Sequence, residues 1–414
     1  MRHAAGRPSR RPRWLSLGVG SIGATSFLSD TGHEMVTAIL PSFIINVLGG
    51  SAAVLGLIEG FSDALTGLSK LAGGPLADDP RRRRRMASGG YTVTAVATGA
   101  IGITVATWQA GILRGISWAA RGFRSPARDS MLATLAAEGA TGRAYGVERA
   151  GDNLGAVLGP LLGGALATWI GVRPTIWVSV IPGLLAALAI GVAARQARLV
   201  VAETPGGKTR LLDGYRRLRG TGLLRVLIPI ALFEGGNLAA TLLILRANEL
   251  LIAEGFPTAA AIALTTVLYA AYNASAALLS IPAGALIDRI GARTVLALGA
   301  AAYVAAYFGL AFTAPVWGFV LLFFVLGGIG IGLGETAEST LVAHQVPDAM
   351  RGSGFGMLGL VQAGGDLTAT VIGGAIYTAA GAAACFTYAG IWMAAAGIVA
   401  ALLPLRKPEL PAAA

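Results

Sequence analysis

Long apolar runs, separated by short polar stretches, make up most of this sequence. A helix that crosses a bilayer needs about 20 predominantly apolar residues. The pattern predicts twelve such helices, over approximately residues 17–46, 52–77, 87–108, 109–137, 143–170, 173–195, 223–252, 258–287, 293–313, 315–343, 350–380 and 383–405. We therefore expect an all-α membrane protein with twelve transmembrane helices.

The composition agrees with this pattern. Hydrophobic residues make up 55% of the 414 positions and charged residues only 13%, whereas soluble domains carry about 25% charged residues. The first apolar run follows a basic tail, as in a signal peptide, but it is too long and lacks a small-residue cleavage site, so we expect it to be retained. The single cysteine, Cys385, excludes an intramolecular disulfide.

The net charge of +11 is explained by topology and does not indicate nucleic-acid binding. Lysine and arginine gather in alternate connections, whereas the intervening loops 47–53 and 253–258 have none. Positive loops face the cytoplasm, so both termini are expected there, in an inner or plasma membrane. The basic set is Arg2, Arg7, Arg10, Arg11, Arg13, Arg81–Arg85, Arg195, Arg198, Lys208, Arg210, Arg216, Arg217, Arg219, Arg225, Arg289, Arg293, Arg351, Arg406 and Lys407.

A polar stretch over 196–222 divides the chain into two halves that repeat each other at an offset of 210 residues. The repeat aligns Gly74-Pro75-Leu76-Ala77-Asp78 with Gly284-Ala285-Leu286-Ile287-Asp288, Tyr145-Gly146 with Phe355-Gly356, and Gly163-Gly164 with Gly373-Gly374. We expect a six-helix bundle over 1–195, a cytoplasmic central loop over 196–222 and a second, pseudo-symmetric six-helix bundle over 223–414. Parallel repeats of this kind place the substrate path between the halves.

The two aligned loops resemble the loop signature of the major facilitator superfamily, and the resemblance extends over essentially the whole chain. The second copy, Gly284-x-Leu286-x-Asp288-Arg289-x-Gly291-x-Arg293, is closer to the family pattern; in the first, Asp79-Pro80 and Arg81 depart from it. The resemblance implies that this loop latches the outward-facing state. The gating residues it implies are Gly74, Asp78, Arg82, Arg83, Asp288 and Arg293. From the residues alone, Asp78 can accept hydrogen bonds from a neighbouring helix amino terminus, although a plain positive-inside loop is the alternative.

A second signature lies in the fifth predicted helix and resembles the helix-5 motif of the drug/proton antiporter branch. It consists of Gly155, Gly159, Pro160, Gly163 and Gly164. Small residues four apart let helices approach closely, and the proline kinks the helix. Generic helix packing is the alternative interpretation.

The fourth predicted helix carries four arginines, although a charge at the bilayer centre costs on the order of 2.5–3.5 kcal/mol. Arg114, Arg121 and Arg128 are seven residues apart, so they share one helix face, which must point into the bundle. We expect carboxylates of the first two helices to balance Arg114, and Glu148 or Asp152 to balance Arg121. For Arg124 and Arg128, side chains that reach the cytoplasmic surface are the alternative.

Carboxylates of the first half are therefore the candidates for proton coupling or for the substrate cavity. A carboxylate in a low dielectric holds its proton more tightly, and a nearby arginine reverses this effect. The leading candidates are Asp30 and Glu34, followed by Glu59 and Asp63; fixed ion pairs are the alternative. The full candidate set is Asp30, His33, Glu34, Glu59, Asp63, Arg114, Arg121, Glu148 and Asp152.

These features favour a proton-coupled antiporter that exports small amphipathic compounds, with Phe27, Phe43, Trp118, Phe233, Tyr269 and Tyr272 as possible cavity-lining residues. Transport of an anionic metabolite, through Arg114 and Arg121, is one alternative. Export of a transition metal, with Asp30, His33 and Glu34 as weak ligand candidates, is another. A membrane sensor is disfavoured because the central loop and tails are short, and no enzyme motif is present. We expect no cofactor, and a monomer whose partners are the substrate, protons and the bilayer.

Overall fold

The computed structural model describes residues 14–200 and 215–402, and within them every regular element is helical. The basic residues of both tails, and most of the predicted central loop, lie outside the described residues. The elements are α1 (Leu17–Ser42), α2 (Ala52–Ala77), α3 (Pro80–Ala100), α4 (Thr107–Leu135), α5 (Thr141–Ile170), α6 (Val172–Val178), α7 (Val180–Val200), α9 (Leu223–Gly236), α10 (Ala240–Glu254), α11 (Thr258–Ile290), α12 (Ala292–Phe312), α13 (Trp317–Gln345) and α14 (Arg351–Leu402).

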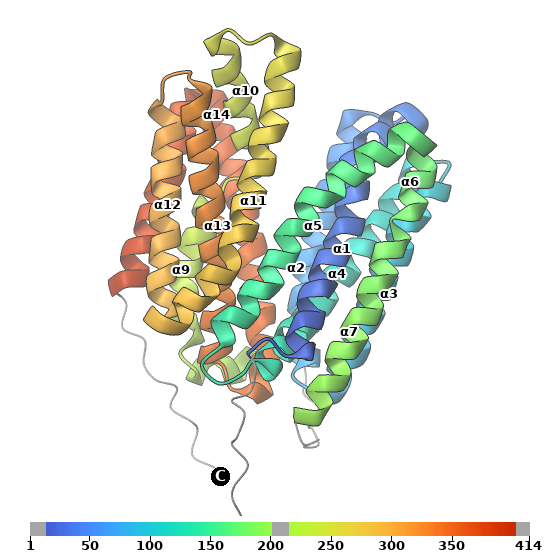
Figure 1. The fold of residues 1–414 in the computed structure, drawn as a ribbon, viewed down its shortest axis with the longest axis vertical. Helices are drawn as coiled ribbons and strands as arrows, with labels where there is room; N and C mark the ends of the chain where they lie inside the picture. The colour runs from blue at the N-terminus through green and yellow to red at the C-terminus, as the bar shows by residue number, and fades with distance from the viewer. Residues whose placement is uncertain (1–13, 201–214, 403–414) are drawn as a thin grey trace, which may run out of the picture.

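The helices form two bundles, α1–α7 and α9–α14, which lie side by side (Figure 1). They meet at the end where the described chain starts and finishes, here called the tail end, and splay apart toward the opposite end, here called the far end. Contacts between the bundles run mainly along α5 with α11 and along α2 with α14. The molecule is therefore closed at the tail end.

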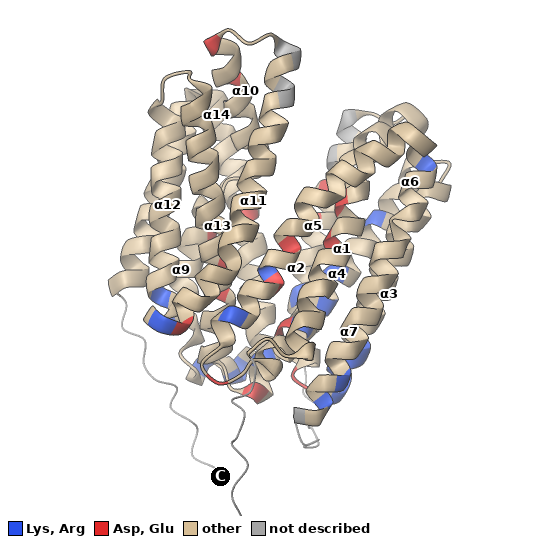
Figure 2. Ribbon diagram, in the orientation of Figure 1, with Lys and Arg blue, Asp and Glu red and all other residues tan. Residues whose placement is uncertain are grey.

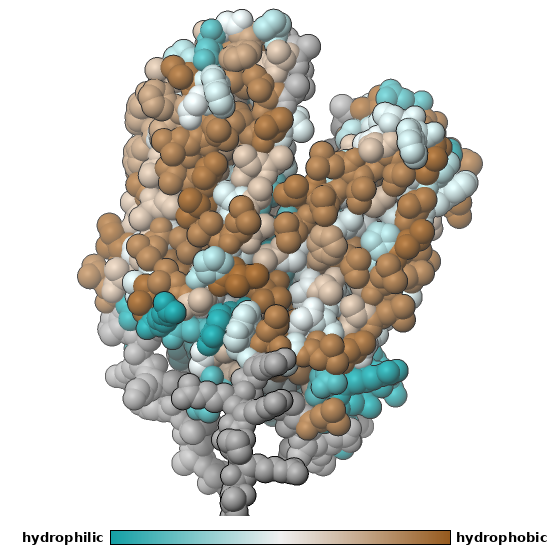
Figure 3. All heavy atoms as spheres, in the orientation of Figure 1, coloured by the Kyte–Doolittle hydropathy of each residue, from teal (hydrophilic) through white to brown (hydrophobic). Residues whose placement is uncertain are grey.

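Seven helical segments within the described residues are long and apolar enough to cross a membrane, and all of them lie after residue 140. The earlier helices α1, α2 and α4 carry the charged side chains of the first half, which lower their hydropathy. Figure 2 shows these charges at mid-depth in the first bundle. The apolar outer surface of both bundles (Figure 3) suits contact with lipid tails.

Several helices are interrupted. The α1 helix ends in a π-helical turn over Phe43–Val47, and the long α14 is broken at Gly381, which has a φ of +86°. A three-residue gap separates α9 from α10, although the sequence predicts one continuous helix over 223–252. The arginines Arg81–Arg85 also differ from expectation, because they form the start of α3 instead of a loop.

The departure of Asp79-Pro80 from the loop signature explains that early helix start. The side chain of Asp79 caps α3 by accepting a hydrogen bond of 2.9 Å from the backbone N–H of Arg81. Pro80 occupies the first helical position, where its fixed φ and missing N–H cost nothing.

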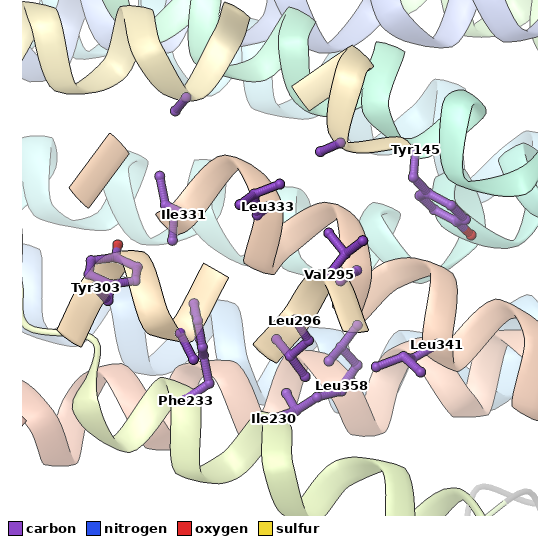
Figure 4. Close-up of a cluster of buried hydrophobic side chains, with 14 of the residues drawn as sticks. Tyr145, Ile230, Phe233, Val295, Leu296, Tyr303, Ile331, Leu333, Leu341 and Leu358 are labelled. Atoms are coloured by element: carbon purple, nitrogen blue, oxygen red, sulfur yellow. The ribbon is translucent and has the colours of Figure 1, made fainter. Parts of the chain in front are cut away.

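The core of the second bundle is densely apolar. Figure 4 shows the buried side chains of Ile230, Phe233, Val295, Leu296, Tyr303, Ile331, Leu333, Leu341 and Leu358 packed between α9, α12, α13 and α14. Any polar group in this bundle therefore depends on its neighbours for hydrogen bonds.

Candidate functional site

Glycines bring the two bundles into backbone contact at the tail end. A side chain on Gly74 of α2 would lie 2.9 Å from the carbonyl oxygen of Gly352 on α14. A side chain on Gly284 of α11 would clash with the backbone of Gly142 on α5. Only glycine permits both approaches.

Asp78 stabilises the first of these contacts, between α2 and α14, by accepting hydrogen bonds. Its carboxylate accepts a hydrogen bond of 2.9 Å from the backbone N–H of Ser353 and a second of 2.5 Å from the Ser353 hydroxyl. Ser353 lies in the first turn of α14, where the helix dipole favours a negative charge. Burial raises the pKa of Asp78, and the hydrogen bonds from Ser353 counteract that rise. The sequence anticipates this helix-terminus contact for Asp78, and its gating role stays a prediction.

Asp288 makes the equivalent contact on the other side. It accepts hydrogen bonds from the backbone N–H of Gly142, at 2.8 Å, and from Nε of Arg143, at 2.8 Å. Asp78 and Asp288 are 210 residues apart, as are Arg143 and Ser353. The two halves therefore latch onto each other through a pair of pseudo-symmetric carboxylates.

The arginines of the loop signature differ in what they join. Arg83 is buried and donates to the carbonyl oxygens of Ala77, at 2.6 Å, and of Asp348 in the other half, at 3.1 Å. Arg82 is half exposed and pairs with Asp79. Arg293 binds carbonyl oxygens at the end of α14, within its own half. Of these three, Arg83 is the one that joins the two halves.

A cleft opens between the bundles at the far end, as Figure 3 shows. In Figure 1, α5 of the first bundle and α11 of the second lie on either side of this opening. The two bundles are therefore in contact at the tail end and separated at the far end.

The glycines of the helix-5 motif pack α5 against α1. A side chain on Gly155 would lie 2.9 Å from Cβ of Asp30, and one on Gly159 would lie 2.5 Å from Cβ of Glu34. Gly163 likewise meets the backbone of α1, whereas Gly164 has open space around it. Close packing against α1 thus explains three of the four glycines. It also fixes where Asp30 and Glu34 of α1 lie relative to α5.

Arginines of α4 hold this part of α1 from the other side. Arg121 binds both carboxylate oxygens of Asp30, at 2.9 and 3.0 Å. Arg114, whose side chain is fully buried, pairs with Glu59 of α2 at 3.1 Å. The expected partner of Arg114 on the second helix is confirmed. The expectation that Glu148 or Asp152 balances Arg121 holds only in part, because Asp30 forms the ion pair and Asp152 contributes a second nearby negative charge. Asp30 takes that place because α1 lies next to α4 at this depth.

The two lower arginines do not extend to the surface. Arg124 is 3% exposed, donates to Ser29 Oγ at 2.9 Å, and lies over the ring of Tyr91. Arg128 pairs with Glu148 at 2.8 Å and with Asp129 at 2.9 Å. The alternative in which Arg124 and Arg128 reach the cytoplasmic surface is therefore wrong, since serine, carboxylate and aromatic partners inside the bundle bind them.

One arginine that the sequence analysis did not select connects the halves at mid-depth. Arg149 of α5 lies 3.4 Å from Glu148 and 3.7 Å from Glu335 of α13, and it donates to Ser339 at 3.3 Å. Asp152, one turn further on, lies 3.9 Å from Arg149. The signal was available, because Arg149 lies between Glu148 and Asp152, which are both in the candidate set.

His33 is packed and has no ionic partner other than Glu34. Its ring meets Trp118 edge to face at 4.8 Å, and its Nε2 lies 3.9 Å from Glu34. Because Arg121 already occupies both oxygens of Asp30, the three side chains do not converge on a common point. Within residues 14–200 and 215–402, no group of three or more potential ligand side chains could hold a metal ion.

Two of the candidate carboxylates form no ion pair with an arginine among the described residues. Glu34 has 27% of its side chain exposed, and Asp63 of α2 is exposed. Of the expected cavity-lining aromatics, Tyr269 and Tyr272 of α11 stack on each other at 6.1 Å. By contrast, Phe43 and Phe233 are fully buried in apolar clusters, so these two do not line the cleft.

Comparison with known proteins places this geometry in a family. The model of the Major Facilitator Superfamily matches residues 22–264 and 247–414. An "Uncharacterized MFS-type transporter MJ1317" of Methanocaldococcus jannaschii is 28% identical over 368 residues, covering 88% of this chain and 89% of the relative.

Solved structures share the fold. The crystal structure of the Escherichia coli fucose:proton symporter FucP superposes with a TM-score of 0.71 at 14% identity, covering 95% of this chain and all of that one. The human organic anion transporter MFSD10 superposes with a TM-score of 0.67 at 16% identity, with the same coverage. At these identities the likeness concerns the fold alone. Since the family model matches nearly the whole chain, this protein belongs to the Major Facilitator Superfamily.

Proposed function

We propose that this transporter is a proton-coupled antiporter that exports small amphipathic compounds by alternating access. In this proposal the chain is a monomer that crosses the cell membrane twelve times, with both termini in the cytoplasm. The tail end is then the cytoplasmic end, and the structure corresponds to an outward-facing state.

The observation that carries the proposal is that two candidate carboxylates, Glu34 and Asp63, form no ion pair with an arginine among the described residues. Most carboxylates of the first half are neutralised, as the pairs Asp30–Arg121 and Glu59–Arg114 illustrate. Glu34, on the same helix as Asp30, and Asp63 are the exceptions within the part of the chain that the structure describes. A carboxylate of this kind can bind either a proton or a cationic group, but not both at once.

This competition is the basis of the proposed coupling. In the outward-facing state, protons from outside displace a bound cationic substrate from Glu34 and Asp63. After the latches of Asp78 and Asp288 release, the cleft opens to the cytoplasm, the protons leave and a new substrate binds. Tyr269 and Tyr272 would contact the apolar part of the substrate.

The alternatives have less support. An anionic metabolite requires a free Arg114 or Arg121, and both guanidinium groups are paired with carboxylates. A transition metal requires converging ligands, and Asp30 is already held by Arg121.

Proteoliposomes that contain a pH-sensitive dye test the proposal. Lipophilic cations, organic anions and divalent metals are added separately to vesicles with purified protein and to vesicles without it. Proton movement that only lipophilic cations trigger would support the proposal. Proton movement triggered by organic anions or metals instead would replace it with one of the alternatives.

A further inference from the structure

Two glutamates face each other inside the second half. Glu234 of α9 is 4% exposed and Glu338 of α13 is 0% exposed, and their carboxyl groups lie within hydrogen-bonding reach of each other. Asn237 donates to Glu234 Oε2 at 3.2 Å, and Gln362 of α14 donates to Glu338 Oε2 at 2.9 Å. Oε2 of each glutamate thus accepts a hydrogen bond from a neutral side-chain amide.

One further oxygen of this pair lacks a hydrogen-bond donor. Glu338 Oε1 is buried and has no hydrogen-bond partner among the described residues. No lysine or arginine of the described chain forms an ion pair with either glutamate. Arg149 of α5 has an acidic partner of its own, because it pairs with Glu335.

Two ionised carboxylates cannot lie this close in a buried site without a cation. A single proton removes one of the two charges and also supplies the missing donor. The O–H of one carboxyl group then donates to the facing oxygen of the other, which gives Glu338 Oε1 a hydrogen bond and leaves one negative charge on the pair. The amide donors of Asn237 and Gln362 then stabilise that charge. A metal ion is a poorer fit, since the described residues contain no group of three or more ligand side chains that could hold one.

The helix break between α9 and α10 connects this pair with Asp366. Asn237 lies in the break, where it donates to both Glu234 and Asp366 Oδ1, the latter at 3.4 Å, and accepts from the hydroxyl of Tyr303 at 3.3 Å. Asp366 of α14 is exposed. Broken helices at the centre of transporters often line ion sites, and here the break links the exposed Asp366 with the buried pair.

We propose that Glu234 and Glu338 hold one exchangeable proton between them, which reaches the pair from Asp366, the exposed carboxylate that shares the Asn237 amide with Glu234. The second half then contains a proton-binding site in addition to the carboxylates of the first half. Its role in transport rests on the proposed function, but its existence does not.

Infrared spectroscopy of the purified, full-length protein in detergent tests this pair directly. At neutral pH we expect a band from a protonated carboxyl group, which is lost in the double variant Glu234→Gln/Glu338→Gln and shifted in Glu338→Gln. Glu335→Gln is the matched control, because Glu335 lies on the same helix but faces Arg149; it should keep the band. A wild-type protein without the band, or a double variant that retains it, would overturn the proposal.

A second measurement needs no variant. Wild-type protein grown with carbon-13 glutamate should show the band at lower frequency, whereas carbon-13 aspartate should leave it in place. A band that moves only with aspartate would assign the proton to another group and overturn the proposal.

These outcomes are separable from those of the proposed function. If the band behaves as expected and vesicles show no substrate-driven proton movement, the antiport proposal fails and the proton site stands. If proton movement is normal and the band is missing, the proton site fails and antiport through the first half stands.

Discussion

Arg121 holds both carboxylate oxygens of Asp30, at 2.9 and 3.0 Å, and so ties α4 to α1 at mid-depth. Glu34, one turn further along α1, has no such partner. The two residues that the sequence presents as equivalent candidates therefore differ: Asp30 forms an ion pair with an arginine, and Glu34 forms none among the described residues. This difference defines the first two predictions.

Arg121→Ala should destabilise the protein because Asp30 would be left buried without its cation. Breaking a buried ion pair by removing one partner costs about 3–5 kcal/mol. The melting temperature of the purified protein measures the effect, and Arg82→Ala, which removes a half-exposed arginine, is the control. An Arg121→Ala protein with the wild-type melting temperature would show that the pair does not stabilise the bundle.

Glu34→Gln should abolish substrate-driven proton movement and change the melting temperature little, since Glu34 forms no ion pair with an arginine among the described residues and lies 3.9 Å from His33. Asp30→Asn should lower the melting temperature, because it leaves Arg121 with one carboxylate oxygen fewer. Both variants are compared in proteoliposomes and in thermal unfolding. Normal proton movement in Glu34→Gln would remove this residue from the coupling mechanism.

Gly159→Ala and Gly164→Ala should behave differently, although both positions belong to the helix-5 motif. A methyl group on Gly159 would lie 2.8 Å from the carbonyl oxygen of Thr31, whereas one on Gly164 meets nothing within 4 Å. Overpacking of this kind costs about 1–3 kcal/mol. Equal melting temperatures for the two variants would contradict the packing described here.

Asp78→Asn should weaken the latch and shift the protein toward the state that is open at the tail end. The variant keeps one acceptor for Ser353 and loses the second; a hydrogen bond to a charged group contributes about 1.5–3 kcal/mol, so the shift should be about tenfold or more. Spin labels on cysteines that replace Arg85 and Arg289, in a Cys385→Ala background, measure the distance across the tail end.

Asp288→Asn should produce the same shift, because Asp288 makes the pseudo-symmetric contact with the start of α5. If either variant leaves the distance distribution of the wild type unchanged, that carboxylate does not act as a latch.

Much of the fold was predictable because its determinants are local. The apolar runs locate most of the helices within a few residues, although α3 begins seven residues earlier than predicted. The offset of 210 residues, read from three aligned motifs, corresponds to the paired contacts at the tail end. The break between α9 and α10 was missed since an apolar run gives no signal where a helix unwinds. Its one local indication is Gly235-Gly236-Asn237.

The charge partners were harder to predict. Helical spacing places Arg114, Arg121 and Arg128 on one face, but it does not say which carboxylate of a neighbouring helix lies at the same depth. The glycines of α5 decide this, because they set how closely α1 approaches and therefore bring Asp30 to Arg121. The Glu234 and Glu338 pair was likewise out of reach, since the two residues lie on different helices 104 positions apart.

The coupling of proton and substrate movement is the central claim, and an imposed pH gradient tests it most directly. Proteoliposomes that are acidic inside are supplied with a lipophilic cation at the same concentration on both sides, and the internal concentration is followed over time. The account predicts accumulation inside, as protons leave in exchange, and loss of that accumulation when an ionophore collapses the gradient. A cation concentration that stays equal on both sides of wild-type vesicles, for a compound shown to be transported, would contradict it.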